Sequence, residues 1–437
     1  MMNDGIKPVV SFVKDVPVQA QVDVLVVGGG PAGVAAAVTA ARQGARVFLA
    51  EACPFFGGLG TAALVPAFMT FTDGEHFLAG GVGKEVYDKT NENRPSYVPP
   101  TSIQVEQLKR VYDDMVSDAG VDFRFETKLV GLLQDGGRVT HGIFSGKTDL
   151  FAVGASVVID ATGDALVCHM AGAPCEKGDE EGRMMAGTLC ALWAGIEWDL
   201  RDGPANARLE QAFEDGVFTS LDRHLPGVWR VGGHLGGTNI GHAYGVDGTN
   251  EASLTKALVF SRKLLLEYER YYKEYVRGYA HMEPVVTGAM GIRETRRIAG
   301  DYVLTIEDFH ARAVFADEIG RYCYPVDIHA STSGQKSYEK FREEHTNFRY
   351  QKGESYGIPY RSLLPKSLDN VLAAGRSIST DRYMQSSVRV MPGCFITGQA
   401  AGAAAALCKG NGTVRSVEIS ALRAALIAAG AYLPPVE

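Results

Sequence analysis

The stretch VDVLVVGGGPAG at residues 22–33 decides the fold class of this 437-residue chain. Its first six residues are almost all apolar, which predicts a buried parallel strand. Residues 31–43 then predict a helix, because they are mostly strong helix formers, Pro31 stands where its missing N–H costs nothing, and Gly44 follows the last turn. A strand, a glycine turn and a helix in this order predict a dinucleotide-binding site.

The three glycines of the turn are expected to have separate roles. Gly28 permits the tight turn, Gly30 lets the backbone approach a pyrophosphate, and Gly33 allows the helix to pack closely on the strand. A second strand at 46–50 ends in Glu51, whose carboxylate could accept hydrogen bonds from both hydroxyls of an adenosine ribose. An acid there favours FAD or NAD over NADP. The alternative is a glycine-rich turn that merely connects strand to helix.

A second glycine-rich run, GGLGT at residues 57–61, follows Glu51 and implies another close approach of the backbone to a ligand. Here the sequence resembles the FAD-dependent oxidoreductases of the two-dinucleotide-binding-domain flavoprotein superfamily, which have the glutathione-reductase-type FAD fold. Further stretches look like the family called FAD-dependent oxidoreductase, some members of which carry a xanthan lyase label: VIDATGD (158–164), GIRETRRIAGDY (291–302), YPVDIH (324–329) and 370–376. The resemblance covers residues 22–433.

The resemblance implies an α/β fold with FAD as cofactor. It consists of a discontinuous Rossmann-like FAD-binding domain at 20–165 and 366–437, a small β-meander, and an inserted α+β substrate domain at 166–365. The residues independently allow the meander, because short β-rich runs flank a turn at Asp135-Gly136-Gly137. Its strands are predicted at 121–125, 127–133, 139–144 and 151–159.

Two later segments complete the expected cofactor site. Residues 371–374 predict a buried strand followed by Gly375 and Arg376, where Arg376 could neutralise a phosphate or form a surface salt bridge. Residues 395–408 predict a helix so rich in small side chains that its backbone must pass close to a flat group or another helix. We expect the flavin there, and the resemblance implies that N–H groups near the start of this helix point at it. An alanine-rich core helix is the alternative.

The predicted site residues form two sets. The resemblance adds to the first set the turn that begins at Ala161, placed against the dinucleotide, and the backbone of Leu129, placed at the adenine. The cofactor-binding set is Gly28, Gly30, Pro31, Ala32, Gly33, Glu51, Gly57, Gly58, Leu59, Thr61, Leu129, Ala161, Thr162, Gly163, Gly375, Arg376, Cys394, Phe395 and Thr397. The catalytic set is His329, Asp327 and Arg293.

The catalytic set comes from the inserted domain. Asp327 and His329 share one face if their run is extended, and a carboxylate beside an imidazole suits a base that removes a hydroxyl or amine proton as hydride leaves. Scaffolding is the alternative role for His329. Arg293 and Arg297 would share one face of a β-like run that could hold a substrate carboxylate, with cross-strand ion pairs as the alternative.

Other parts of the inserted domain carry less chemical information. Residues 250–277 predict a long amphipathic helix, whose tyrosines we expect to pack rather than react. His234 and His242 lie in a glycine-rich stretch and are weaker candidates for the base.

Composition excludes several classes of function. The formal net charge is -8 with no long block of like charge, so neither a nucleic acid nor a membrane surface is an expected partner. Seven cysteines without a C-x-x-C pair indicate no disulfide framework and no metal site. The segment 1–20 has no continuous apolar stretch, and no apolar run reaches the 18 residues of a membrane span. We therefore expect a cytoplasmic protein.

Missing motifs narrow the expected reaction. A second strand-linked G-x-G-x-x-G is absent, as is a redox-active cysteine pair, so electrons must come from the substrate or from an external partner. We expect a dehydrogenase or oxidase that passes a hydride between a small polar substrate and flavin N5. The alternatives are a reductase of an activated double bond, a flavoprotein subunit with an electron-acceptor protein as partner, and a flavin used without net redox. A homo-oligomer is also open.

Overall fold

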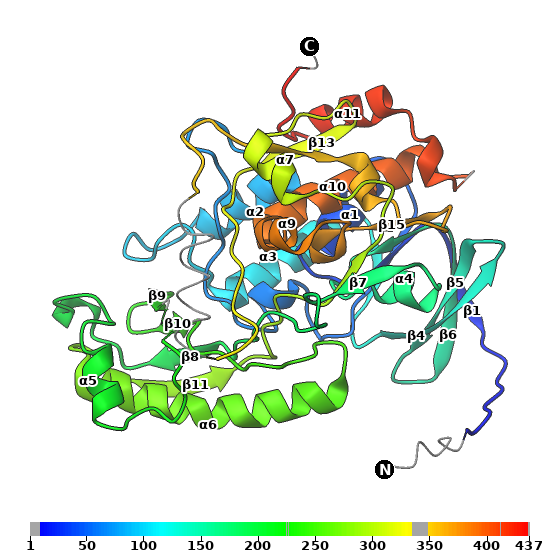
Figure 1. The fold of residues 1–437 in the computed structure, drawn as a ribbon. Coiled ribbons are helices and arrows are strands. Elements are labelled where there is room, and N and C mark those ends of the chain that lie inside the picture. The colour runs from blue at the N-terminus through cyan, green and yellow to red at the C-terminus, as the bar shows by residue number, and fades with distance from the viewer. Residues whose placement is uncertain (1–8, 224, 226, 334–347, 411, 436–437) are drawn as a thin grey trace.

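A seven-stranded sheet forms the centre of the computed structural model, which describes residues 9–223, 225, 227–333, 348–410 and 412–435 (Figure 1). Its strands run in the order β3-β2-β1-β6-β5-β4, and β15 also pairs with β6. They are β1 (Val18–Val27), β2 (Val47–Ala50), β3 (Asp122–Arg124), β4 (Lys128–Asp135), β5 (Arg138–Ser145), β6 (Leu150–Asp160) and β15 (Val371–Ala373). The predicted strands and the turn at Asp135 are confirmed to within a few residues.

Strand β6 joins two kinds of pairing in one sheet. Its first half is antiparallel to β5 and completes a meander of β4, β5 and β6, while Val158–Asp160 pairs in parallel with β15. The assignment of the strand at 121–125 to this meander was wrong, because β3 pairs in parallel with β2 at the other edge of the sheet. Along most of its length β6 is also parallel to β1. Two segments separated by more than 200 residues therefore meet at the carboxyl end of β6, where parallel sheets bind ligands. The predicted α/β class with a Rossmann-like sheet is confirmed.

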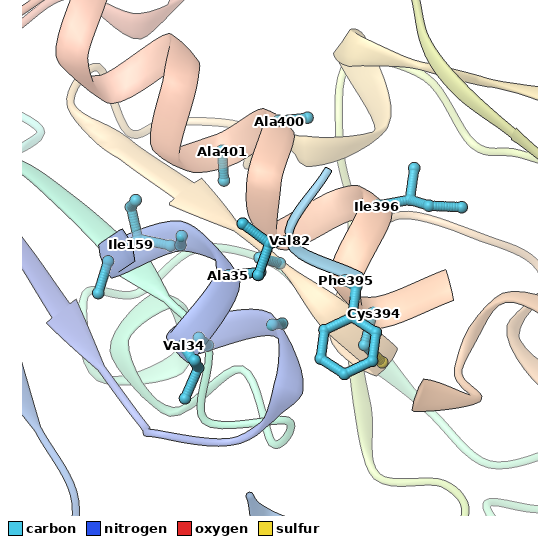
Figure 2. Packing of buried hydrophobic residues seen from close by; sticks show 14 of the residues in the cluster. Val34, Ala35, Val82, Ile159, Cys394, Phe395, Ile396, Ala400 and Ala401 are labelled. Carbon is cyan, nitrogen blue, oxygen red and sulfur yellow. The ribbon is translucent and has the colours of Figure 1, made fainter. Parts of the chain in front are cut away.

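Helix α1 (Pro31–Arg42) packs directly on α10 (Met391–Leu407), and this contact explains the small residues of α10. A Cβ on Gly398 would collide with the carbonyl oxygen of Ala32, and one on Gly402 with that of Ala36. Figure 2 shows the two helices side by side among buried apolar side chains. The expectation that a flat flavin requires this small-residue stripe was wrong, because another helix occupies the close approach.

A second lobe lies to one side of the sheet (Figure 1). Its antiparallel sheet has the order β11-β8-β10-β9, and its buried residues between Leu189 and Ile292 form a core of their own. The predicted long helix is present as α6 (Glu251–Tyr275), with Asn250 as its N-cap, and its buried tyrosines pack as expected. The elements are β8 (Ala191–Ala194), α5 (Leu209–Glu214), β9 (Val228–Arg230), β10 (Gly236–Thr238) and β11 (Glu283–Thr287).

The remaining elements surround α1 and α10 or connect the two lobes. Buried residues between Leu304 and Leu364 belong to the same core as α1 and α10, not to the core of the second lobe. The predicted domain bounds stay a prediction, and residues 436 and 437 of the last range lie outside the described residues. The main connecting elements are α2 (Val82–Asn91), α3 (Val105–Asp118), β7 (Cys175–Lys177), β12 (Arg296–Ile298), α7 (Ile306–Ala311), β13 (Glu318–Tyr322), β14 (Tyr356–Pro359), α9 (Arg382–Val388) and α11 (Ile419–Ala428).

Within the described ranges, no single helix is long and apolar enough to cross a membrane, and only α9 and α10 taken together would be, with a bend of 92° between them.

Candidate functional site

The first glycine turn is shaped by close contacts on two sides and by open space on the third. Gly28 has φ +97°, and a Cβ there would lie 2.7 Å from the carbonyl oxygen of Ala161. A Cβ on Gly33 would collide with the carbonyl oxygen of Gly28. A Cβ on Gly30 would meet no described atom within 4 Å. Gly28 and Gly33 are therefore required by packing, whereas Gly30 faces the space in which a pyrophosphate would lie.

The second glycine run lies against the first. The Gly57 N–H donates to the carbonyl of Gly29 at 2.8 Å, and a Cβ on Gly58 would lie 3.4 Å from the Cα of Gly30. Thr61 donates its hydroxyl to the carbonyl of Phe56 at 2.6 Å, so this side chain fixes the loop. Both glycine-rich runs thus border one space beside Gly30.

Glu51 connects these two runs through its carboxylate. Its oxygens accept the N–H groups of Gly29 and Cys53, each at 2.6 Å. The side chain is buried, and burial raises its pKa against the opposing effect of these hydrogen bonds. The carboxylate therefore has a structural role in addition to the predicted contact with a ribose.

Arg376, which follows β15, binds to the turn after β6. The guanidinium donates to the carbonyl of Gly163 at 2.6 Å and pairs with Asp164 at 2.7 Å. Arg376 thus forms a salt bridge, and its predicted contact with a phosphate stays a prediction. Thr162 in the same turn donates its hydroxyl to the buried carboxylate of Asp160 at 2.7 Å. Leu129 is buried on β4, which is separated from β6 by β5.

Helix α10 begins at Met391, four residues earlier than predicted. Because the helix starts at Met391, the N–H of Cys394 already donates to the carbonyl of Val390 at 3.0 Å. Phe395 and Thr397 lie still deeper in the helix, and the Thr397 hydroxyl accepts the N–H of Gly375 at 3.0 Å. The assignment of terminal N–H groups to Cys394, Phe395 and Thr397 was wrong. The N–H groups of the first turn belong to Met391 and Gly393.

A cavity of about 230 Å³ lies where α10 and the second glycine run meet the second lobe. Leu59 and Met391 line it on the side of the glycine runs. All three predicted catalytic residues line it as well, namely Arg293, Asp327 and His329. The three predicted catalytic residues, which lie more than 200 positions from the glycine runs in sequence, thus meet the second run at one cavity.

Arg293 is buried in the wall of this cavity. Its guanidinium donates to the Ala186 carbonyl at 2.8 Å, to the Thr188 hydroxyl at 2.9 Å and to the Asn239 side chain at 3.2 Å. Over the described ranges, no carboxylate forms a salt bridge with Arg293. The predicted common face with Arg297 was wrong, because Arg297 is paired with the buried Glu294 at 2.8 Å.

His329 begins a chain of buried polar side chains. Its Nε2 lies 3.5 Å from Asp327 Oδ1, and its Nδ1 lies 2.9 Å from Nε2 of His242. His242 Nδ1 in turn lies 3.1 Å from Asp222 Oδ2, and the Tyr244 hydroxyl donates to Asp222 at 3.0 Å. Asp327 is held from its other side by Arg389, which donates to Oδ2 at 3.0 Å.

With this geometry established, comparison with known proteins identifies the family. The model of the family described as "FAD dependent oxidoreductase" matches residues 23–426. The chain belongs to this family. FAD is its cofactor, and the protein is an FAD-dependent oxidoreductase enzyme. The open side of Gly30 and the free first turn of α10 fit such a group.

Solved structures that are similar to this chain include several flavin enzymes. A geranylgeranyl bacteriochlorophyll reductase-like protein from Thermoplasma acidophilum is 14% identical, with 89% of this chain and 78% of that chain covered and a TM-score of 0.45. The flavin-dependent brominase Bmp2 is 13% identical, with 94% and 83% covered and a TM-score of 0.46. For p-nitrophenol 4-monooxygenase from Pseudomonas putida the values are 13%, 94%, 84% and 0.43. No curated protein sequence matches. At these similarities the reaction of this oxidoreductase does not follow from its neighbours.

Burial sets the charge state of the groups around the cavity. Burial, followed by the nearby cation of Arg293, lowers the pKa of His329 to about 3, so its imidazole is neutral near pH 7. Burial would raise the pKa of Asp327, but His329 and Arg389 outweigh it and hold that pKa below its usual range. Burial, and then Arg389, lowers the pKa of Arg293 to about 10, which still leaves it charged. The oxidoreductase thus presents a buried cation and a neutral imidazole to one cavity.

Sequence reasoning missed part of this site. Arg389 follows α9 directly before the small-residue helix, and its position before that motif was an available signal. Asp222 and Tyr244 carried no signal, because they reach the site only through the fold. His242 was ranked too low, whereas His234 is exposed and donates to the Ile196 carbonyl at 3.1 Å, outside the cavity. Over the described ranges, no group of three His, Cys, Asp or Glu side chains could hold a metal ion.

Proposed function

We propose that this enzyme is an FAD-dependent dehydrogenase or oxidase of a small polar substrate that carries a carboxylate. The observation that supports the proposal most is the cavity shared by the glycine run, the start of α10 and the three predicted catalytic side chains. Its volume of about 230 Å³ lies below the usual range for drug-sized ligands, roughly 300–1,000 Å³. A small metabolite is therefore the expected substrate.

Arg293 supports the carboxylate on the substrate. It is a buried cation whose hydrogen bonds, within the described ranges, go to neutral oxygens, and a carboxylate in the cavity would pair with it directly. A charged hydrogen bond of this kind contributes about 1.5–3 kcal/mol to binding. We expect Arg293→Ala to raise the concentration of substrate needed for half-maximal rate.

His329 is the proposed base. Its neutral imidazole can accept the proton of a substrate hydroxyl or amine, and the carboxylate of Asp327 at 3.5 Å would stabilise the imidazolium that forms. Because His329 lines the cavity, a substrate bound there would lie beside its imidazole. FAD, when bound, supplies the acceptor for the hydride that leaves carbon.

The proposal is tested by anaerobic reduction of the purified yellow protein. A panel of small 2-hydroxy and 2-amino acids is mixed with the enzyme while the visible flavin band is followed. His329→Ala should keep FAD but slow reduction by roughly 10²–10⁴-fold, the usual contribution of a general base. His234→Ala, outside the cavity, is the matched control and should reduce at the wild-type rate.

Reduction by dithionite separates proton transfer from damage to the cofactor site. Both variants should be reduced by dithionite as fast as the wild type, because this route needs no protein base. Wild-type reduction rates in His329→Ala with a true substrate would overturn the role of His329. If no acid reduces the flavin but activated alkenes reoxidise the dithionite-reduced enzyme, the protein is instead a double-bond reductase.

The partners of the reaction are also proposals. We expect a soluble electron acceptor, either oxygen or an electron-acceptor protein, no nucleic acid or membrane partner, and a cytoplasmic location. Reoxidation of the substrate-reduced enzyme by air, followed at the same flavin band, distinguishes an oxidase from a dehydrogenase. Size-exclusion chromatography with light scattering tests whether the chain forms a homo-oligomer, which the sequence leaves open.

A further inference from the structure

One wall of the cavity is apolar, and the proposed reaction gives it no role. Val65, Ala67 and Met69 line the cavity and lie two positions apart along one non-helical segment. Side chains at this spacing share one face of an extended chain. Pro66 and Phe68, which lie between them, pack elsewhere, Pro66 against the second lobe and Phe68 on other aromatic rings. We call this face of residues 65–69 the apolar wall.

Backbone pairing holds the apolar wall beside residues 101–103. Ala67 pairs with Ser102 as in an antiparallel sheet, so the chain is extended at this point. The Phe68 N–H also donates to the carbonyl of Thr101 at 2.8 Å. The apolar wall is therefore formed before a ligand arrives, and little binding energy is lost in ordering it.

Further apolar side chains continue from the apolar wall around the cavity. Trp229 comes from β9 of the second lobe, whereas Val390 and Met391 come from the start of α10. Most of the side chains that a ligand would meet are therefore apolar. The remaining members of this set are Leu59, Cys190 and Ile292.

The charged side chains of the cavity leave one cation in excess. Of the described residues that line it, Arg293, Arg389 and Asp327 carry a charge near pH 7, whereas His329 is neutral. Arg389 pairs with Asp327 at 3.0 Å, and the hydrogen bonds described for Arg293 go to neutral oxygens. A ligand with one carboxylate would balance this charge. A second carboxylate would have to leave water without a cation of its own, which is costly.

We infer that the cavity selects monocarboxylic acids with an apolar body, whose carboxylate pairs with Arg293 and whose body lies against the apolar wall. The inference rests on the proposed function for the acid to be a substrate, and it narrows that function to 2-hydroxy or 2-amino acids with aliphatic or aromatic side chains. Binding strengthens with the apolar area that leaves water, so the body of the acid decides which substrate is preferred.

Unreactive acids test the ligand class without turnover. Acetate, butanoate and hexanoate, which have no hydroxyl or amino group, are titrated into the FAD-bound enzyme by calorimetry. The dissociation constant should fall roughly fourfold for each added methylene. Succinate has the same number of carbon atoms as butanoate and should bind more weakly. Equal affinity for acetate and hexanoate, tighter binding of succinate than of butanoate, or no binding of any of these acids overturns the inference.

Substitution of Met69 tests the apolar wall itself. Met69→Gln keeps the length of the side chain but makes it polar, so it should weaken hexanoate binding roughly 10-fold. Acetate has only a methyl group to place there and should be affected little. Met170→Gln, which changes a methionine outside the cavity, is the matched control. Equal hexanoate binding by the two variants would contradict the role of the apolar wall.

Flavin reduction separates this inference from the proposed function. If the unreactive acids bind as expected but no 2-hydroxy or 2-amino acid reduces the flavin, the proposed reaction is wrong and the ligand class stands. If 2-hydroxybutanedioate reduces the flavin at a lower concentration than 2-hydroxyhexanoate does, the reaction stands and the inference is wrong. The expected result is that half-saturating concentrations fall from 2-hydroxypropanoate to 2-hydroxyhexanoate.

Discussion

The glycine turns and the substrate cavity are built in opposite ways. The turns lie within residues 28–61, where Gly28 has φ +97° and Gly57 φ +109°, and Ala161 is the distant residue that packs against Gly28. The cavity uses side chains from segments as distant as Asp222 and Arg389, joined only after the fold has formed. Local sequence largely determines the glycine turns, whereas the cavity depends on tertiary packing.

The largest expected effect tests whether local backbone geometry decides the first region. Gly33→Ala places a methyl group against the carbonyl oxygen of Gly28, where neither backbone can move without separating α1 from β1. We expect a loss of stability of about 4 kcal/mol or more and little soluble FAD-bound protein, measured by expression and urea denaturation.

Gly30→Ala is the matched control for that collision. A Cβ at Gly30 meets no described atom within 4 Å, and its φ of -70° suits alanine. The cofactor-free variant should therefore unfold at the wild-type urea concentration, yet retain less FAD, because the methyl group enters the space beside the phosphates. Equal destabilisation by the two substitutions would contradict separate roles for these glycines.

An intermediate effect is expected at Glu51, whose carboxylate both accepts hydrogen bonds from the backbone and is predicted to bind the ribose. Glu51→Ala leaves the N–H groups of Gly29 and Cys53 without their acceptor, and an unsatisfied buried donor costs about 1–3 kcal/mol. The variant should lose stability even without FAD and should also release FAD more readily. Urea denaturation of cofactor-free protein checks the first effect, and equilibrium dialysis the second. Unchanged stability would show that a ribose is the main partner of Glu51.

A graded effect is expected with pH, and it belongs to the cavity. His329 has a folded-state pKa of about 3, below the ordinary value of about 6.5, so only the unfolded chain binds this proton between those two values. The contribution of His329 to the free energy of unfolding is therefore fully present above about pH 6.5. It should fall by at most ~1.4 kcal/mol per pH unit toward pH 3. His329→Gln should lose less stability than the wild type between pH 7 and pH 5 in urea titrations. Parallel losses in both proteins would refute this origin.

Local sequence predicted the sheet, the meander, α1, α6 and both glycine runs to within a few residues. These elements have strong periodicity or glycines with a single geometric purpose, so nearby residues suffice. It also selected Arg293, Asp327 and His329, which the structure brings to one cavity. A pattern of residue types can therefore nominate chemistry before the fold is known.

The points that the sequence left undecided share one physical cause, because each depends on which segments of the folded chain come into contact. Arg376 could bind a phosphate or a carboxylate, and the sequence does not show that Asp164 lies within its reach. The small residues of α10 fit a flat ligand or a helix equally well, and the neighbouring α1 decides. Asp222 became part of the site through His242, a contact between two loops that no local pattern encodes.

The contact between α1 and α10 also has a consequence for biosynthesis. About 350 residues separate the two helices, so a ribosome working at roughly 5–20 residues per second needs on the order of 20–70 s to make α10 after α1 has emerged. During that interval α1 has no partner for its alanine-rich face, and the first turn of α10 does not yet exist. We therefore expect FAD to be captured by the finished polypeptide rather than by the nascent chain.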